Sequence, residues 1–182
     1  MLLDTPICDF GWKAPDFELK DSDGKTFKMS DHLGDKGLLV AFICNHCPYV
    51  QAIGESLAKD ADLLLASGTN VLAVMSNDYH DYDEDSPENM KRFGEHFGFN
   101  FPYLVDEDQS VGKAYGAICT PDFFGLNKDG ELQYRGRLDN WGMRVQGERI
   151  PELVNAMQMI AETGKGPKDQ VPSVGCSIKW RN

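Results

Sequence analysis

The chain has 182 residues, of which 41% are hydrophobic and 26% charged, and its formal net charge is −11. This length allows one domain with a sizeable core, and the composition is that of a globular protein. The negative charge argues against nucleic acid or an anionic membrane as a partner, and the longest apolar run, residues 38–43, is far too short to span a membrane.

The alternation and spacing of apolar residues predict strands and helices that follow one another along the chain. Residues 1–15 are expected to be irregular, and residues 164–182 form a tail rich in Gly, Pro and Lys. Between them we expect a hairpin at 17–29 that turns at Asp23-Gly24, strands at 38–43, 70–76, 101–105, 121–126 and 131–135, and helices from Pro48 to Ser67, from Pro87, at 108–116 and at 150–163. This order predicts one α/β domain, 1–182, with a central mixed sheet and helices on both faces.

The segment Cys44-Asn45-His46-Cys47-Pro48 stands where a buried strand turns into a helix. A Cys-x-x-Cys pair in this position is a redox arrangement, and in open α/β sheets the functional site lies at the carboxyl ends of the strands. Pro48 suits the first helical position because its missing N–H is not needed there, and this makes Cys47 the N-cap. A thiolate at the positive end of the helix dipole is stabilised.

The expected size of this stabilisation is modest. Lowering a thiol pKa from about 8.5 to about 7 requires about 2 kcal/mol, whereas a helix terminus supplies roughly 0.3–1 kcal/mol. We therefore expect a modest shift at Cys47, with His46 as the nearest additional help.

Other features have plainer interpretations. The acidic loop 78–85 is expected to be solvated, and the remaining histidines are expected to lie at the surface. A zinc site is not predicted, because such sites usually take four ligands and the chain has one Cys-x-x-Cys pair. The five cysteines are scattered and odd in number, and no signal peptide is expected, so we predict a reducing compartment, the cytoplasm.

Several motifs resemble the thioredoxin superfamily, in particular its branch of redoxin, peroxiredoxin and thiol-specific antioxidant proteins. They are Ala14-Pro15-Asp16-Phe17, the 38–48 segment, Thr120-Pro121-Asp122-Phe123-Phe124 and Lys128-Asp129-Gly130. The pattern looks closest to uncharacterised bacterial peroxiredoxin-like proteins with Cys-Asn-His-Cys-Pro and a Gly-Cys-Ser-Ile-Lys-Trp tail, here 175–180. The resemblance implies a thioredoxin-like fold with an N-terminal hairpin addition and an extended C-terminal tail.

The resemblance also implies roles for single residues. Pro121, after Thr120, should be the cis-proline that faces the cysteines. Cys47 matches both the thioredoxin nucleophile and the peroxidatic cysteine, and Cys44 takes the place of the peroxiredoxin threonine. The family's arginine is missing where Thr120-Pro121 stand, which favours dithiol–disulfide exchange, with Cys47 attacking and Cys44 resolving, over peroxidase chemistry.

The other cysteines receive secondary expectations. Cys119 should lie near the site as a small packed residue. Cys176 would act as an accessory, resolving thiol if the tail folds back over the site, and Cys8 has no expected role.

Three functions remain open from the sequence. The first is a thiol–disulfide oxidoreductase that uses no cofactor, acts on protein or small-molecule disulfides and is recycled by an external thiol reductant. The second is a thiol peroxidase in which Cys47 is oxidised by a peroxide. The third is a redox-inert or metal-binding module that uses the groove beside Pro121. The oligomeric state is left open.

Overall fold

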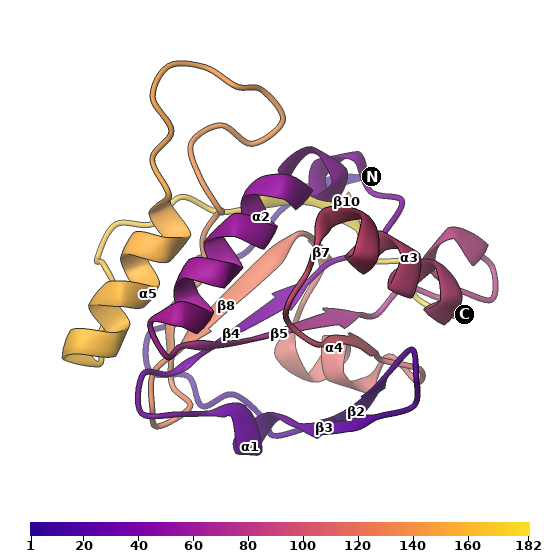
Figure 1. The fold of residues 1–182 in the computed structure, drawn as a ribbon, viewed down its shortest axis with the longest axis horizontal. Coiled ribbons are helices and arrows are strands. Elements are labelled where there is room, and N and C mark those ends of the chain that lie inside the picture. Colours follow the sequence, from indigo (N-terminus) through magenta and orange to yellow (C-terminus); the bar gives the residue numbers. More distant parts are fainter.

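The computed structural model describes all residues 1–182. Two sheets and five α-helices make up the fold (Figure 1). The strands are β1 (Leu2–Asp4), β2 (Glu18–Asp21), β3 (Thr26–Lys28), β4 (Leu38–Phe42), β5 (Asn70–Met75), β6 (Tyr103–Val105), β7 (Cys119–Thr120), β8 (Asp122–Leu126), β9 (Leu132–Tyr134) and β10 (Val174–Ser177). The helices are α1 (Met29–His32), α2 (Pro48–Ala66), α3 (Pro87–Phe97), α4 (Ser110–Tyr115) and α5 (Glu152–Thr163), and one 3-10 turn spans Asp83–Asp85.

The main sheet has the strand order β3-β2-β6-β5-β4-β8-β9. Its centre is β4, which runs parallel to β5 with Ala41 opposite Ala73, and antiparallel to β8 with Ala41 opposite Phe123. All five residues of β4 are buried, as expected of a strand covered on both faces. A second, smaller sheet has the order β1-β10-β7 and joins the two ends of the chain to the segment before Pro121.

Alternate residues of β4 belong to two separate apolar layers. Leu39 and Ala41 pack with residues of α2, α3 and α5. Leu38 and Val40 pack on the opposite face with residues of α1 and α4. Figure 1 shows α2 and α5 side by side on one face of the sheet, with α1 and α4 on the other. The predicted mixed sheet with helices on both faces is therefore confirmed.

The helix ends follow from the sequence. Cys47 is the N-cap of α2 and Pro48 its first residue, as predicted. Ser86 caps α3 by accepting a hydrogen bond from the Asn89 backbone N–H at 3.3 Å. The last helix begins at Glu152, later than the predicted residue 150, because Pro151 stands at its N-cap with a non-helical backbone.

The two ends of the chain differ from the prediction. Residues 1–15 were expected to be irregular, yet Leu2–Asp4 form β1. The tail was expected to be extended and no strand was assigned to it, yet Val174–Ser177 form β10, which pairs antiparallel with both β1 and β7. Pairing between residues that are more than 150 positions apart leaves no periodic signal in the sequence itself. None of the helices is both long enough and apolar enough to cross a membrane.

Candidate active site

The two cysteines of the predicted pair lie at the junction of β4 and α2. Cys44 follows the strand and Cys47 caps the helix, with φ −74° and ψ 120°, so that the chain is still extended where the helix begins. Both side chains are buried, with exposed fractions of 1% for Cys44 and 0% for Cys47. The Cys47 sulfur therefore lies in the interior of the site, where no bulk water competes for hydrogen bonds.

Thr120 contacts both sulfurs. Its hydroxyl lies 3.3 Å from Cys44 Sγ, and its carbonyl oxygen lies 3.3 Å from Cys47 Sγ. The Thr120–Pro121 peptide is cis, as the resemblance implied. Residues 120 and 121, where β7 meets β8, thus lie beside the cysteine pair although they follow it by more than 70 positions in the sequence.

The pair has the electrostatic asymmetry that dithiol chemistry needs. A hydrogen bond from the Cys44 thiol, supported by the Cys176 side chain and backbone N–H, lowers the pKa of Cys47 below that of an ordinary thiol, although burial opposes the shift. The same hydrogen bond to Cys47, together with burial, raises the pKa of Cys44 well above its usual value. This difference favours the thiolate on Cys47 and a protonated thiol on Cys44, the arrangement that the predicted roles of attacking and resolving sulfur require.

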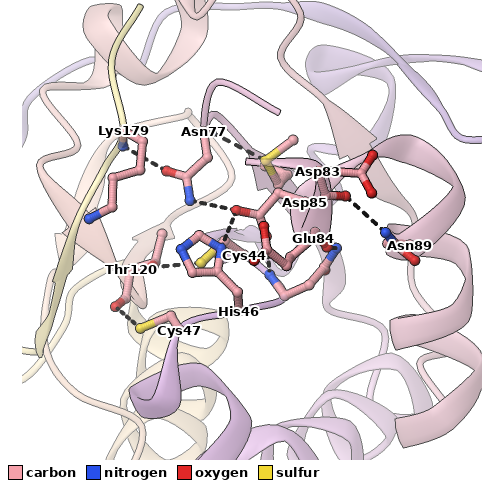
Figure 2. A network of polar contacts seen from close by, with 12 residues as sticks. Cys44, His46, Cys47, Asn77, Asp83, Glu84, Asp85, Asn89, Thr120 and Lys179 are labelled. Carbon is pink, nitrogen blue, oxygen red and sulfur yellow. Dashed lines mark hydrogen bonds and ion pairs between the residues drawn. The ribbon is translucent and has the colours of Figure 1, made fainter. Parts of the chain in front are cut away.

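His46 has a different role from the one predicted. Its Nδ1 lies 2.6 Å from Asp85 Oδ2, and Figure 2 shows the ring directed at that carboxylate. The Asp85 carboxylate raises the pKa of His46, which favours the charged form of the ring. The expectation that His46 assists the Cys47 thiolate is replaced by this ion pair, and the thiol of Cys44 gives the assistance instead.

Asp85 is the functional residue that sequence reasoning missed. It is fully buried at 0% exposure, whereas residues 80–84 are exposed, so the prediction of a solvated 78–85 loop holds for most of the loop and fails at Asp85. Its carboxylate accepts hydrogen bonds from the Asn45 backbone N–H at 2.7 Å and the Asn77 amide at 2.9 Å (Figure 2). Burial would raise the pKa of Asp85, but these bonds and His46 lower it overall. One carboxylate therefore fixes the turn between the two cysteines.

The sequence does contain a signal for the polar network around Asp85. Asn77 and Asp85 follow β5, whose carboxyl end lies beside that of β4 because the two strands are parallel neighbours. Polar residues after two such strands meet at one edge of the sheet. The loop holds several carboxylates, however, and nothing in the sequence distinguishes Asp85 from its exposed neighbours.

Cys44, His46 and Asp85 also bring a sulfur, a ring nitrogen and a carboxylate oxygen within 4.8 Å of one another. This donor set is of a kind that zinc accepts in sites with three protein ligands. A metal bound there would break the ion pair between His46 and Asp85 and would occupy the Cys44 sulfur. These residues therefore cannot bind a metal and support the Cys44–Cys47 dithiol at the same time.

The remaining thiols differ in their position: Cys176 lies beside the reactive sulfur, Cys119 is packed near the site in β7, and Cys8 lies away from it. Cys176 in β10 lies beside Cys47, so the tail does fold back over the site. Cys119 is buried at 0% exposure, and burial raises its pKa to about 12, as suits a packed structural thiol. Burial also raises the pKa of Cys8 to about 11.

A cavity of about 430 Å³ lies on the other side of the cis-proline. It is bounded by Tyr49 of α2, by Pro121, by Trp141 and Met143 of the loop between β9 and α5, and by Val174 of β10. That loop extends beyond the rest of the ribbon in Figure 1. The cavity offers an aromatic and apolar surface one residue away from the threonine that contacts both sulfurs.

The titration of Cys47 gives a direct test of this geometry. Because a depressed pKa keeps the thiolate present until the pH falls through that lowered value, thiolate absorbance should persist at pH values where a free thiol is protonated. The measurement is the ultraviolet difference between the protein and its Cys47→Ser variant as a function of pH. Cys44→Ala removes the hydrogen-bond donor and should raise the pKa, whereas Cys8→Ser is the matched control and should leave it unchanged. An unchanged profile in Cys44→Ala would contradict the assignment of the donor.

The chain is similar to known proteins in both sequence and structure. A crystal structure of an uncharacterized conserved protein from Geobacillus kaustophilus is 38% identical, covers 100% of this chain and 97% of its own, and has a TM-score of 0.93. Thiol-disulfide oxidoreductase ResA of Geobacillus thermodenitrificans is 28% identical over 124 residues, 68% of this chain and 66% of the relative, so the chain spans slightly less than two thirds of that protein.

The fold is shared more widely. The thioredoxin domain of a thiol-disulfide oxidoreductase from Bacteroides vulgatus matches 69% of this chain and 86% of its own at 18% identity, with a TM-score of 0.59. The fold is therefore thioredoxin-like. The family model described as AhpC/TSA matches residues 10–135, which hold both cysteines, Asp85 and the cis-proline. The chain is a member of the AhpC/TSA family.

Proposed function

We propose that this protein is a thiol–disulfide oxidoreductase that cycles Cys44 and Cys47 between dithiol and disulfide. One observation carries the proposal: Cys44 and Cys47 lie together at the N-terminus of α2, and Thr120, whose peptide bond to Pro121 is cis, contacts both sulfurs. The relative named thiol-disulfide oxidoreductase supports the same activity.

The reaction follows from the positions of the two sulfurs. The Cys47 thiolate attacks one sulfur of a substrate disulfide, a bond forms between them, and the other substrate sulfur leaves as a thiolate. Cys44 then loses its proton, attacks Cys47 and releases the second substrate thiol. The substrate gains two electrons, the protein holds a Cys44–Cys47 disulfide, and an external thiol reductant restores the dithiol.

The experiment is disulfide reduction by single cysteine variants. Cys47→Ser is expected to lose turnover entirely, because the attacking sulfur is gone. Cys44→Ser should retain attack and form a covalent adduct on Cys47, seen after rapid acid quenching as a mass increase of one substrate half, but it cannot form the Cys44–Cys47 disulfide. Cys8→Ser is the matched control with unchanged turnover. Full turnover in Cys47→Ser would rule out the proposal.

The site favours disulfides over peroxides as substrate. A peroxidase of this kind would oxidise Cys47 to a sulfenic acid, which Cys44 would convert to a disulfide with release of water. Peroxidases of this family use an arginine to assist the peroxide. The buried Arg135 is already engaged elsewhere, because Asp122 binds it, with Nη2 2.9 Å from Oδ2 and Nε 3.2 Å from Oδ1, and its Nη2 also donates to the Gly116 carbonyl. Peroxide consumption measured on the same variants separates the two activities, since a peroxidase would consume peroxide in a Cys47-dependent manner.

We place the activity in the cytoplasm. The support is the composition: five cysteines in no paired pattern and a strongly acidic chain. Fractionation of the native cell, with trapping of the thiol state at lysis, is the measurement, and recovery of the protein outside the cytoplasm would overturn the placement.

A further inference from the structure

The tail strand β10 covers the reactive sulfur. It pairs antiparallel with β7 so that Cys176 stands opposite Thr120, the residue whose carbonyl oxygen is 3.3 Å from Cys47 Sγ. Reactive cysteines are usually partly exposed, yet Cys47 is 0% exposed here. A thiol of the chain itself therefore occupies the position beside Cys47 from which a substrate sulfur would approach.

Close packing of the backbone holds Cys176 in this position. A Cβ atom on Gly175 would lie 1.8 Å from the Thr120 carbonyl oxygen, so only glycine allows the strand to come this near. Hydrogen bonds fix the strand on both sides of Cys176: the Ser173 hydroxyl donates to the Pro121 carbonyl at 2.8 Å, and the Ile178 N–H donates to the Ile118 carbonyl at 2.9 Å.

Cys176 and Cys44 stand in the same chemical relation to Cys47. Each thiol packs with Cys47 and lowers the pKa of the Cys47 thiol, and the pKa of each is itself raised above the ordinary value. Burial raises the pKa of Cys176 to about 11, and the nearby Lys179 ammonium opposes that rise. The half-buried Cys176 is also the more accessible of the two thiols.

We propose that Cys176 is a third redox-active thiol of this site, held over Cys47 by β10, so that Cys47 forms a disulfide with Cys176 as well as with Cys44. The proposal rests on the proposed function in one respect, that Cys47 is the attacking sulfur. In the new step Cys176 loses its proton to solvent and attacks Cys47 in the mixed disulfide. The Cys47–Cys176 bond forms, the bond from Cys47 to the substrate sulfur breaks, and the substrate leaves as a thiolate. An external thiol reductant opens the Cys47–Cys176 disulfide.

The first test uses the Cys44→Ser variant of the full chain, treated with oxidised glutathione and mapped by mass spectrometry after acid quenching. We expect the glutathione adduct on Cys47 to resolve into a Cys47–Cys176 disulfide. The double variant Cys44→Ser/Cys176→Ser should keep the adduct, whereas Cys44→Ser/Cys119→Ser is the matched control and should still resolve it, because Cys119 is packed away.

The outcomes separate this proposal from the function it rests on. A stable adduct on Cys47 in Cys44→Ser overturns the role of Cys176 and leaves the oxidoreductase intact. Absence of an adduct on Cys47 in the double variant Cys44→Ser/Cys176→Ser, where no neighbouring thiol can remove it, overturns the proposed function itself.

A backbone variant tests the role of the strand independently of the thiol. Gly175→Ala forces β10 away from Thr120 and should abolish the Cys47–Cys176 disulfide while the Cys44–Cys47 disulfide still forms. Gly94→Ala in α3, where the nearest atom to an added Cβ would be at an ordinary contact distance of 3.7 Å, is the control for a glycine substitution. Thermal unfolding of both variants shows whether the fold is kept. If a folded Gly175→Ala protein formed the Cys47–Cys176 disulfide as readily as the wild type, the proposed role of β10 in holding Cys176 beside Cys47 would be contradicted.

Discussion

Replacing Asp85 by alanine is expected to lower the free energy of unfolding by about 3–5 kcal/mol, the cost of breaking a buried ion pair by removing one partner. The change leaves the His46 cation, the Asn45 N–H and the Asn77 amide without the acceptor that they share. Denaturant unfolding monitored by fluorescence is the measurement. Asp81→Ala, at an exposed position of the same loop, is the matched control and should change stability little.

The ion pair between His46 and Asp85 also makes the free energy of unfolding depend on pH. The raised pKa of His46 means that its contribution is complete below about 6.5, the ordinary value for histidine, and is lost as the pH rises through the folded-state value. The lowered pKa of Asp85 means that its contribution is complete above about 3.9 and is lost as the pH falls through its folded-state value. Wild-type stability relative to Asp85→Ala should therefore be largest between these limits. A difference that does not vary with pH would contradict the ion pair.

Replacing Arg149 by methionine is the second change with a large expected effect, again about 3–5 kcal/mol. Arg149 pairs with two buried carboxylates: Nη2 is 2.5 Å from Asp60 Oδ2, and Nε is 2.8 Å from Asp139 Oδ2. Both acids are 2% exposed, so loss of the guanidinium leaves two unpaired charges in the interior. Methionine matches the unbranched stem of arginine up to Nε, so the loss of stability reports mainly on the guanidinium.

The functional consequence of this change lies at the cavity beside Pro121. Asp139 is part of the cavity wall and Asp60 belongs to α2, so Arg149 fastens the loop between β9 and α5 to the helix that carries Cys47. We expect Arg149→Met to raise KM for bulky disulfides more than it lowers kcat. Arg144→Met, at an exposed position of the same loop, is the control. Equal stability of the two variants would contradict the role given to Arg149.

The sequence predicted those parts of the site that depend on local chemistry. Pro48 marks the first residue of α2 whatever surrounds it, so the position of Cys47 at the helix start followed from two neighbouring residues. The apolar run of β4 and the cap at Ser86 were predictable for the same reason. The cis-proline at Pro121 came from resemblance, since no local rule distinguishes it from the other prolines.

The parts that escaped prediction depend on contacts between distant residues. Asp85 lies among several acidic residues, and its burial follows from the meeting of two loops at the end of β4 and β5. The role of His46 changed for the same reason, because its partner is 39 positions away, like the Glu84 carbonyl that binds Asn45. Strand β10 is four residues long, and its partners stand at the opposite end of the chain and before Pro121.

The pairing of β1 with β10 has a practical consequence for the study of this protein. Leu2 stands opposite Cys176, and the Ser177 N–H donates to the Met1 carbonyl at 2.8 Å. An affinity tag fused ahead of Met1 would lie close to Cys176, whose reactivity the experiments measure. A bulky tag would displace β10 from its pairing with β1. Recombinant material should therefore be assayed after proteolytic removal of the tag, or with the label inserted at an exposed turn such as Asp23-Gly24.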